Sequence, residues 1–353
     1  MSVLAARLVL LVAGPTSAVR RAAPLRAAVA CNAAQCGDRP PQSLPTFLMP
    51  YHEQSLSLTE AAFNNCTVRC SRGLSYGSEL HQTLDVWAPA TGGSGLPIVV
   101  SIHGGGWEFG FPEWAGFPAQ HVCTTPALLV APAYALGEGR RQAWPASRDD
   151  LLQALRWVGE HGAAYGGDPS RIVLTGHSAG GHLASCLGLN PPLLRDAGID
   201  PAAIRALFLV SCPVGIRAED FAPRHWLWTL WIGRPFIRAL YSKVAPNLRA
   251  VIGAPPNEAT ATEASALASV LTADPATLPP VVHITYGVQG DFPFCKPQAR
   301  RLQRILQQLP GGPRVDILEV AGAGHFDTHY ELADGSSAWY SALREVLEQG
   351  VGD

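Results

Sequence analysis

The sequence is poor in charge and nearly devoid of lysine. Only 15% of its 353 residues are charged, and lysine occurs only at Lys243 and Lys296. The formal net charge is −2, so composition gives no sign of a nucleic-acid partner. With 47% hydrophobic residues, the chain is too apolar to stay disordered, and its length allows a large core in one or two domains.

Long apolar runs and metal-binding patterns are also missing. No run reaches the roughly 18 apolar residues that a membrane-spanning helix needs. The eight cysteines are too few for a disulfide scaffold in a chain of this length, and no cysteine–histidine grouping has zinc-finger spacing. We therefore expect no transmembrane segment and no metal site. Cys66 and Cys70 are the only close cysteine pair beyond the leader, and could form a bridge if the protein is exported.

Residues 1–44 differ in composition from the rest of the chain. They contain five arginines and one acidic residue, Asp38, which is typical of a targeting segment. An apolar stretch at 8–14 resembles a secretory signal, whereas the arginine-rich continuation to Cys36 favours a transit peptide for a plastid or mitochondrion. We prefer the transit peptide, with the secretory signal and an uncleaved start as alternatives, and expect one folded domain over 45–353.

Beyond residue 45, short apolar runs alternate with segments of helical periodicity. This alternation predicts an α/β fold with a mostly parallel central sheet and helices on both faces. Residues 81–88 alternate between apolar and polar, which predicts a half-exposed antiparallel edge strand. The other predicted strands are 98–102, 127–133, 171–175, 204–211, 280–286 and 315–320, and the predicted helices are 147–161, 179–187, 297–309 and 336–348.

Residues 213–256 interrupt this alternation. The stretch is rich in tryptophan, including Trp226, and Pro235 would break a helix inside it. We expect an inserted cap of two short helices over the carboxyl ends of the strands. A helix packed on the main core is the alternative.

The strongest chemical signal is the sequence GHSAG at 176–180. The predicted strand 171–175 runs directly into it and a helix of small residues follows, which is the context of a nucleophile elbow. Glycines at both ends of the motif leave room for the sharp turn that exposes the Ser178 hydroxyl. The structural alternative is a glycine-rich helix start with Ser178 as its N-cap.

A second signal, HGGGW at 103–107, directly follows a predicted strand. Acyl transfer builds negative charge on a carbonyl oxygen, and one fixed N–H donor that stabilises it contributes roughly 2.7–4 kcal/mol. We predict that the N–H groups of Gly105, Gly106 and Ala179 form this oxyanion hole, rather than the glycines forming an ordinary turn. His103 is expected to support the loop and not to act in catalysis.

A serine nucleophile needs a base, and the base needs an orienting acid. After an elbow of this kind the acid and then the histidine are expected downstream in the chain. His325 lies in a glycine-flanked loop after the last predicted strand, and Asp291 follows the strand that ends at residue 286. We predict Asp291 as the acid and His325 as the base, with His329 as the fallback. The less suitable residues are His283 (inside a strand), Asp274 (at the wrong strand end) and Asp327 (too close to His325).

From about residue 84 to 347 the chain resembles the α/β-hydrolase fold, and within it the HGGG-bearing esterases related to hormone-sensitive lipase. Four segments resemble the kynurenine formamidase and BD-FAE-type small-esterase branch, and plant prenylcysteine methylesterases share two of the features, YGGDP and HGG. The loop after Tyr134 and residues 213–256 depart from these families, so the resemblance does not identify a substrate. The four segments are QTLDVW at 82–87, YGGDPSR at 165–171, DFPF at 291–294 and HFD at 325–327.

Together, the motifs and the resemblance imply a serine hydrolase that cleaves a carboxylic ester or small amide through an acyl-enzyme, without a metal or organic cofactor. Trp107, His177 and Trp226 are expected to contact the substrate, and the tryptophan-rich insertion favours an apolar or aromatic substrate group. One alternative is a kynurenine formamidase acting on N-formylkynurenine. The other is a non-catalytic ligand-binding protein of the same fold. The sequence does not indicate the oligomeric state.

Overall fold

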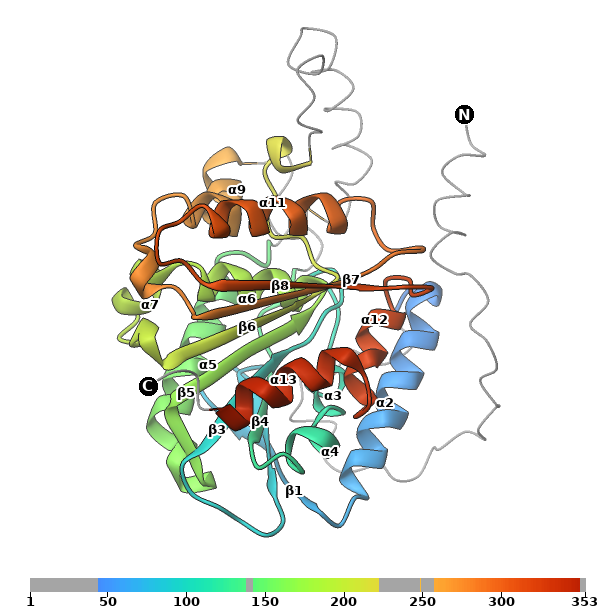
Figure 1. Cartoon of the computed structure of the whole chain (residues 1–353). Coiled ribbons are helices and arrows are strands. Elements are labelled where there is room, and N and C mark those ends of the chain that lie inside the picture. Colours follow the sequence, from blue (N-terminus) through green and yellow to red (C-terminus); the bar gives the residue numbers. More distant parts are fainter. Residues whose placement is uncertain (1–43, 138–141, 222–247, 249–256, 350–353) are drawn as a thin grey trace, which may run out of the picture.

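The computed structural model describes residues 44–137, 142–221, 248 and 257–349. An eight-stranded sheet in the order β1-β2-β4-β3-β5-β6-β7-β8 runs through these residues (Figure 1). β2 pairs antiparallel with β1 and β4, and all other neighbours are parallel, as predicted. The strands are β1 (Val68–Ser75), β2 (Thr83–Pro89), β3 (Leu96–Ile102), β4 (Leu128–Pro132), β5 (Gly167–His177), β6 (Ile204–Val210), β7 (Val281–Gly287) and β8 (Arg314–Val320).

Helices cover both faces of the sheet. Alternate residues of each central strand enter different cores: Ile98 and Val100 of β3 pack on one face and Val99 on the other. The first core includes α5, α6 and α11, and the second includes α2, α3, α4 and α13. The longer helices are α2 (Met49–Phe63), α5 (Ala146–His161), α6 (Ala179–Gly188), α11 (Cys295–Gln307) and α13 (Ala338–Gln349); the shorter ones are α3 (Glu113–Gly116), α4 (Ala119–Val122), α7 (Pro191–Asp196), α9 (Glu258–Glu263), α10 (Ala266–Ser269) and α12 (Asp327–Tyr330).

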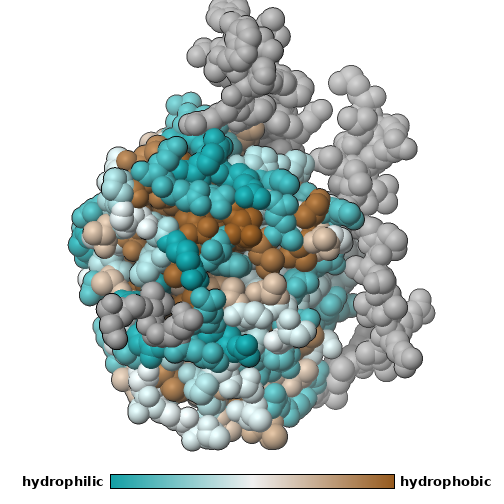
Figure 2. All heavy atoms as spheres, in the orientation of Figure 1, coloured by the Kyte–Doolittle hydropathy of each residue, from teal (hydrophilic) through white to brown (hydrophobic). Residues whose placement is uncertain are grey.

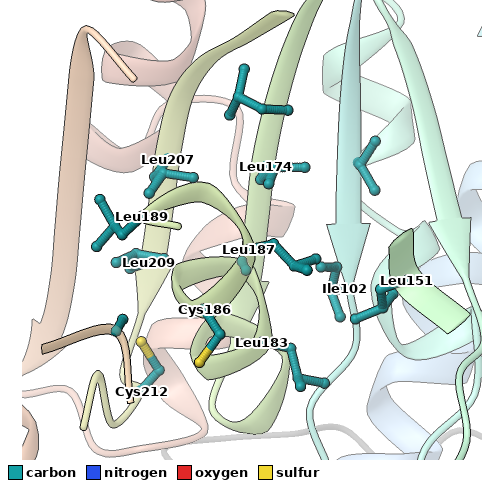
Figure 3. Close-up of a cluster of buried hydrophobic side chains, with 14 of the residues drawn as sticks. Ile102, Leu151, Leu174, Leu183, Cys186, Leu187, Leu189, Leu207, Leu209 and Cys212 are labelled. Atoms are coloured by element: carbon teal, nitrogen blue, oxygen red, sulfur yellow. The ribbon is translucent and has the colours of Figure 1, made fainter. Parts of the chain in front are cut away.

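The core around α6 fixes the position of the segment that follows β5. Leu183 of α6 lies near Leu151 of α5, and Leu187 of α6 faces Leu174 of β5 (Figure 3); all four side chains are at most 1% exposed. Burial of a leucine side chain contributes about 1.5–3 kcal/mol. The helix is thereby held firmly at the carboxyl end of the parallel strands.

At one end of the sheet, one sequence prediction differs from the structure and one strand was not predicted. Residues 81–88 were expected as a half-exposed edge strand, but β2 is buried along its whole length because β1 pairs with its outer side. β1 itself carries two arginines and a glycine, so it has no apolar alternation to reveal it. The other predicted strands and helices all coincide with observed elements, and the largest shift is at β5, which begins at Gly167.

Several further predictions concern residues at or beyond the limits of the description. The predicted leader except Leu44, and the predicted cap except 213–221 and Leu248, lie outside the described residues. Cys66 and Cys70 are both free thiols, so the conditional bridge is not formed. None of the helices within the described ranges combines the length and hydropathy needed to cross a bilayer. Figure 2 shows a hydrophilic surface over α11 and hydrophobic side chains beneath it, along the edge strand β8.

Candidate active site

Ser178 stands at a tight turn between β5 and α6. Its backbone has φ 55° and ψ −120°, a conformation that L-residues rarely adopt and that is found at nucleophile elbows. The turn is so close that a Cβ on Gly176 would lie 2.4 Å from the backbone of Gly180, and a Cβ on Gly180 would lie 2.0 Å from the carbonyl oxygen of Ile102. Both flanking positions therefore require glycine, as the motif predicted.

The structure brings the predicted base and acid to this serine. His325 Nε2 lies 3.0 Å from Ser178 Oγ, and His325 Nδ1 lies 2.8 Å from Asp291 Oδ1. The side chains of His325 and Asp291 are only 3% and 4% exposed. Three residues from separate loops at the carboxyl ends of β5, β7 and β8 thus form one continuous hydrogen-bonded chain.

The alternative acids and bases lie elsewhere. The Nε2 atom of His329 donates to the carbonyl oxygen of Trp114 and lies near the Tyr51 hydroxyl, so this ring supports the site from behind. Asp327 accepts a hydrogen bond from the N–H of Gly324 and shapes the loop before His325. Asp274 caps a single 3-10 turn before β7. None of the three side chains occupies the place of a triad member.

Asp291 is held as a carboxylate by several donors. The Ser211 hydroxyl and the N–H of Gly287 donate to Oδ2, and the N–H of Phe292 donates to Oδ1 beside His325 Nδ1. Burial by itself raises the pKa of Asp291, but the hydrogen bonds from His325 and Ser211 and the nearby imidazole leave it below its ordinary value. The charged form therefore prevails at neutral pH and can hold the imidazole in one orientation.

The glycine loop after β3 turns through consecutive left-handed residues. Gly105 and Gly106 have φ of 117° and 63°, and the N–H groups of Glu108 and Phe109 both donate to the carbonyl oxygen of Gly105. Within the described part of the chain, no backbone carbonyl accepts from the N–H groups of Gly105, Gly106 or Ala179. Ala179 is also the first residue of α6, where backbone N–H groups lack a partner within the helix. These three donors are therefore available to a ligand oxygen.

His103 lies under this loop. Its ring stacks on Tyr134 at 4.3 Å, and the Tyr134 hydroxyl donates to its carbonyl oxygen at 2.8 Å. Burial lowers the pKa of His103 to about 4, so the ring is neutral at physiological pH. This is the supporting position that the sequence predicted.

The residues expected to contact substrate need correction. Trp107 has a left-handed backbone (φ 62°) and is only 4% exposed. Its indole is buried beside α6, where Nε1 donates to Nδ1 of His182. His177 is 2% exposed and bonds the backbone of His325. Both side chains support the site from within the core and neither forms an open pocket wall. Trp226 lies outside the described residues.

Half-buried phenylalanines that the sequence analysis missed lie beside the triad. The Phe292 ring contacts His325 edge to face at 4.3 Å and stacks on Phe294 at 5.2 Å. Phe221 meets Phe294 at 5.4 Å. Phe292 also lines an open cavity of about 520 Å³ beside the acid loop. These rings offer an apolar surface next to His325, and the motif at 291–294 was the sequence signal for it.

One group of side chains near the triad has the composition of a metal site. Ligand atoms of Asp291, Cys295 and His325 lie within 4.8 Å of one another. However, the carboxylate and imidazole already bond each other, and burial raises the pKa of the Cys295 thiol well above its ordinary value. Since metals bind the thiolate, this donor set fits a metal poorly.

Part of the chain is similar in sequence to known esterases. Residues 84–194 match the BD-FAE family model, which confirms the resemblance for that segment. The chain is 39% identical over 136 residues to carboxylesterase NlhH of Mycobacterium tuberculosis, covering 38% of this chain and 41% of that protein. It is 30% identical over 119 residues to probable isoprenylcysteine alpha-carbonyl methylesterase ICMEL1 of Arabidopsis thaliana, covering 33% of this chain and 24% of that one. The matches thus span about two fifths of these relatives or less.

Solved structures agree over a longer part of the chain. An esterase from the archaeon Pyrobaculum calidifontis superposes with a TM-score of 0.63 at 20% identity, covering 89% of this chain and 96% of the other. At that identity the likeness concerns the fold alone. The chain has the α/β-hydrolase fold, as the sequence motifs predicted.

Proposed function

We propose that the protein is a serine esterase that hydrolyses a carboxylic ester or small amide through an acyl-enzyme. The observation that carries the proposal is the unbroken chain of hydrogen bonds from Asp291 through His325 to Ser178. The esterase relatives named above support the same reaction class. A non-catalytic protein of this fold has no need for all three groups at bonding distance.

The geometry suggests how each group acts. His325 Nε2 takes the proton of Ser178 Oγ as the oxygen attacks the carbonyl carbon, and Asp291 stabilises the imidazolium that forms. The N–H groups of Gly105, Gly106 and Ala179 donate to the oxyanion. The imidazolium then gives its proton to the leaving alcohol or amine, and a water molecule repeats the sequence on the acyl-enzyme.

The half-buried rings of Phe292 and Phe294 support an apolar or aromatic group in the substrate. They lie on the acid side of His325, and an apolar group placed there would cover ring surface that is otherwise exposed to water. We therefore propose small esters with apolar acyl or alcohol parts as the substrate class.

Hydrolysis of p-nitrophenyl acetate and butyrate tests the reaction class, with N-formylkynurenine as a third substrate. We expect ester turnover, labelling of the protein by a fluorophosphonate probe, and loss of both in Ser178→Ala. Clear preference for N-formylkynurenine would favour a formamidase instead. Equal labelling of wild type and Ser178→Ala, without turnover, would favour a ligand-binding protein.

We also propose that residues 1–44 direct the protein to a plastid or mitochondrion. The proposal rests on five arginines with a single acidic residue in that segment. Amino-terminal sequencing of the mature protein and fractionation of the cells test it. An intact first residue, or export through the secretory route, would contradict it.

A further inference from the structure

His177, the residue directly before the nucleophile, has no surface that a substrate could reach. It is 2% exposed, and its Nε2 lies 2.8 Å from the backbone carbonyl oxygen of His325. A carbonyl oxygen only accepts hydrogen bonds, so Nε2 carries the proton and Nδ1 is a bare acceptor. The side chain next to the nucleophile thus donates to the backbone of the base.

The same ring also touches the oxyanion loop. A Cβ added to Gly104 would lie only 3.3 Å from His177 Nδ1, so this edge of the imidazole packs directly on the loop. The ring centroids of His325 and His329 lie 4.7 Å and 4.6 Å from that of His177. His177 therefore packs between the glycine loop at 104–106 and the loop that carries His325.

The imidazole of His177 is suited to a purely structural donor role. Burial, together with the neighbouring His329 and His325, lowers the pKa of His177 well below its ordinary value. The ring therefore stays neutral at physiological pH, and it places no second positive charge beside His325 when that residue takes up a proton.

The backbone of His325 needs such support. It follows Gly322 and Gly324, and glycines allow the chain many conformations. Its carbonyl oxygen has a second donor, the Thr328 hydroxyl at 2.9 Å, and this hydroxyl lies 2.7 Å from Ser211 Oγ in the turn after β6, on the side of the acid. The donor from His177 joins the backbone of the base directly to the residue before the nucleophile.

We propose that His177 is a positioning residue, which sets the distance between Ser178 and His325 through its hydrogen bond to the His325 backbone. The proposal rests on the serine esterase function proposed above. A displacement of about 1 Å in a catalytic group can cost about 100-fold in rate, so loss of this bond should act on catalysis more than on substrate binding.

Three variants test the hydrogen bond. His177→Gln places an amide N–H near the position of Nε2, whereas His177→Asn has the same amide on a shorter side chain, and His177→Leu has no donor. With p-nitrophenyl butyrate we expect kcat to fall 10- to 100-fold in the Leu and Asn variants, with KM within about threefold of wild type. His177→Gln should recover most of kcat, and fluorophosphonate labelling should slow in the same order.

His283→Leu is the matched control. His283 is also a buried neutral imidazole, but it lies in β7 and stacks on Phe208, away from the triad. Its loss should shift the melting temperature without lowering kcat by more than about twofold. A general effect of removing a buried histidine would lower kcat in both variants.

The outcomes separate the two proposals. If wild type hydrolyses the ester but all three His177 variants keep its kcat, or if Gln is no better than Asn among folded variants, the positioning role is wrong and the esterase function stands. If wild type neither turns over esters nor reacts with the probe, the proposed function fails, and the positioning role with it.

Discussion

The hydroxyl of Ser211 donates a 2.7 Å hydrogen bond to Oδ2 of Asp291, and it does so from a left-handed backbone conformation with φ 43°. Non-glycine residues in sparsely populated backbone regions cost about 1–3 kcal/mol and persist where the surroundings enforce them. The same hydroxyl lies 2.7 Å from Thr328 Oγ1, and Thr328 donates to the backbone of His325. The strained turn after β6 therefore brings a polar side chain to both the acid and the loop of the base.

Two substitutions of Ser211 distinguish the contribution of its hydroxyl from that of its strained backbone. Ser211→Ala keeps the left-handed strain and removes the donor to Asp291, whereas Ser211→Gly removes both. We expect kcat to fall about tenfold in each variant, since one hydrogen bond to a charged group is worth about 1.5 kcal/mol. Urea unfolding should find Ser211→Gly about 1 kcal/mol more stable than Ser211→Ala. Equal stability would show that the backbone is not strained, and an unchanged kcat would exclude a role for the hydroxyl.

Asp291→Asn should reduce kcat far more than it reduces stability. The amide keeps the shape of the carboxylate but loses its charge and favours the wrong tautomer of His325, an effect of about 10⁴-fold in related triads. Steady-state hydrolysis of p-nitrophenyl butyrate, together with a melting curve, measures both quantities. Asp274→Asn is the control, because Asp274 only caps a turn and asparagine caps equally well. Comparable losses in the two variants would contradict the assignment of the acid.

Acid should destabilise the protein through its buried histidines. Burial lowers the pKa of His103, His182 and His283 to about 4 and that of His329 to about 3. Between pH 4 and 6.5 the unfolded chain therefore binds more protons than the folded chain, so stability rises with pH in this window and is lost as the pH falls. Each histidine contributes a slope of up to about 1.4 kcal/mol per pH unit.

Urea unfolding between pH 7 and pH 4.5 measures this slope. His283→Leu should lower the number of protons taken up on unfolding by about one, and the slope accordingly, because the variant lacks one of the histidines that are protonated on unfolding. A slope that is the same in wild type and His283→Leu would contradict the depressed pKa of His283.

Two glycine-to-alanine substitutions, one at the tight turn beside the nucleophile and one on an exposed helix face, should have opposite effects on stability. In Gly180→Ala the new Cβ would lie 2.0 Å from the carbonyl oxygen of Ile102, so β3 or α6 must move. We expect a loss of about 2 kcal/mol or more in stability and most of the esterase activity. Gly159→Ala, in the exposed face of α5 with no atom near the new Cβ, should instead stabilise by up to about 1 kcal/mol. Thermal melting and ester turnover of both variants check this.

The sequence by itself determined the parallel part of the sheet and the members of the triad. Strands buried on both faces are continuous apolar runs, and these remain visible in the sequence whatever surrounds them. The geometry of the nucleophile turn can be predicted from GHSAG, because only glycine fits at positions 176 and 180. Asp291 and His325 could be chosen because residues after parallel strands meet at one edge of the sheet.

Elements stabilised by polar contacts could not be predicted from apolar runs in the sequence. β1 is an edge strand with two arginines, Arg69 exposed and Arg72 half-buried beside Asp85, and α2 buries Tyr51, His52, Ser55, Thr59 and Ala62, which form no apolar stripe. Their positions depend on partners far along the chain, such as His329, which lies 278 residues from Tyr51.

Only the tertiary structure decided what the side chains around the triad do. Trp107 and His177 belong to the expected motifs, but the direction of each side chain follows from the backbone φ of the turn and from the space left by neighbouring loops. Ser211 meets Asp291 across 80 residues of sequence. Contacts of this kind carry no local signature, because they arise when separately predictable strands are brought side by side.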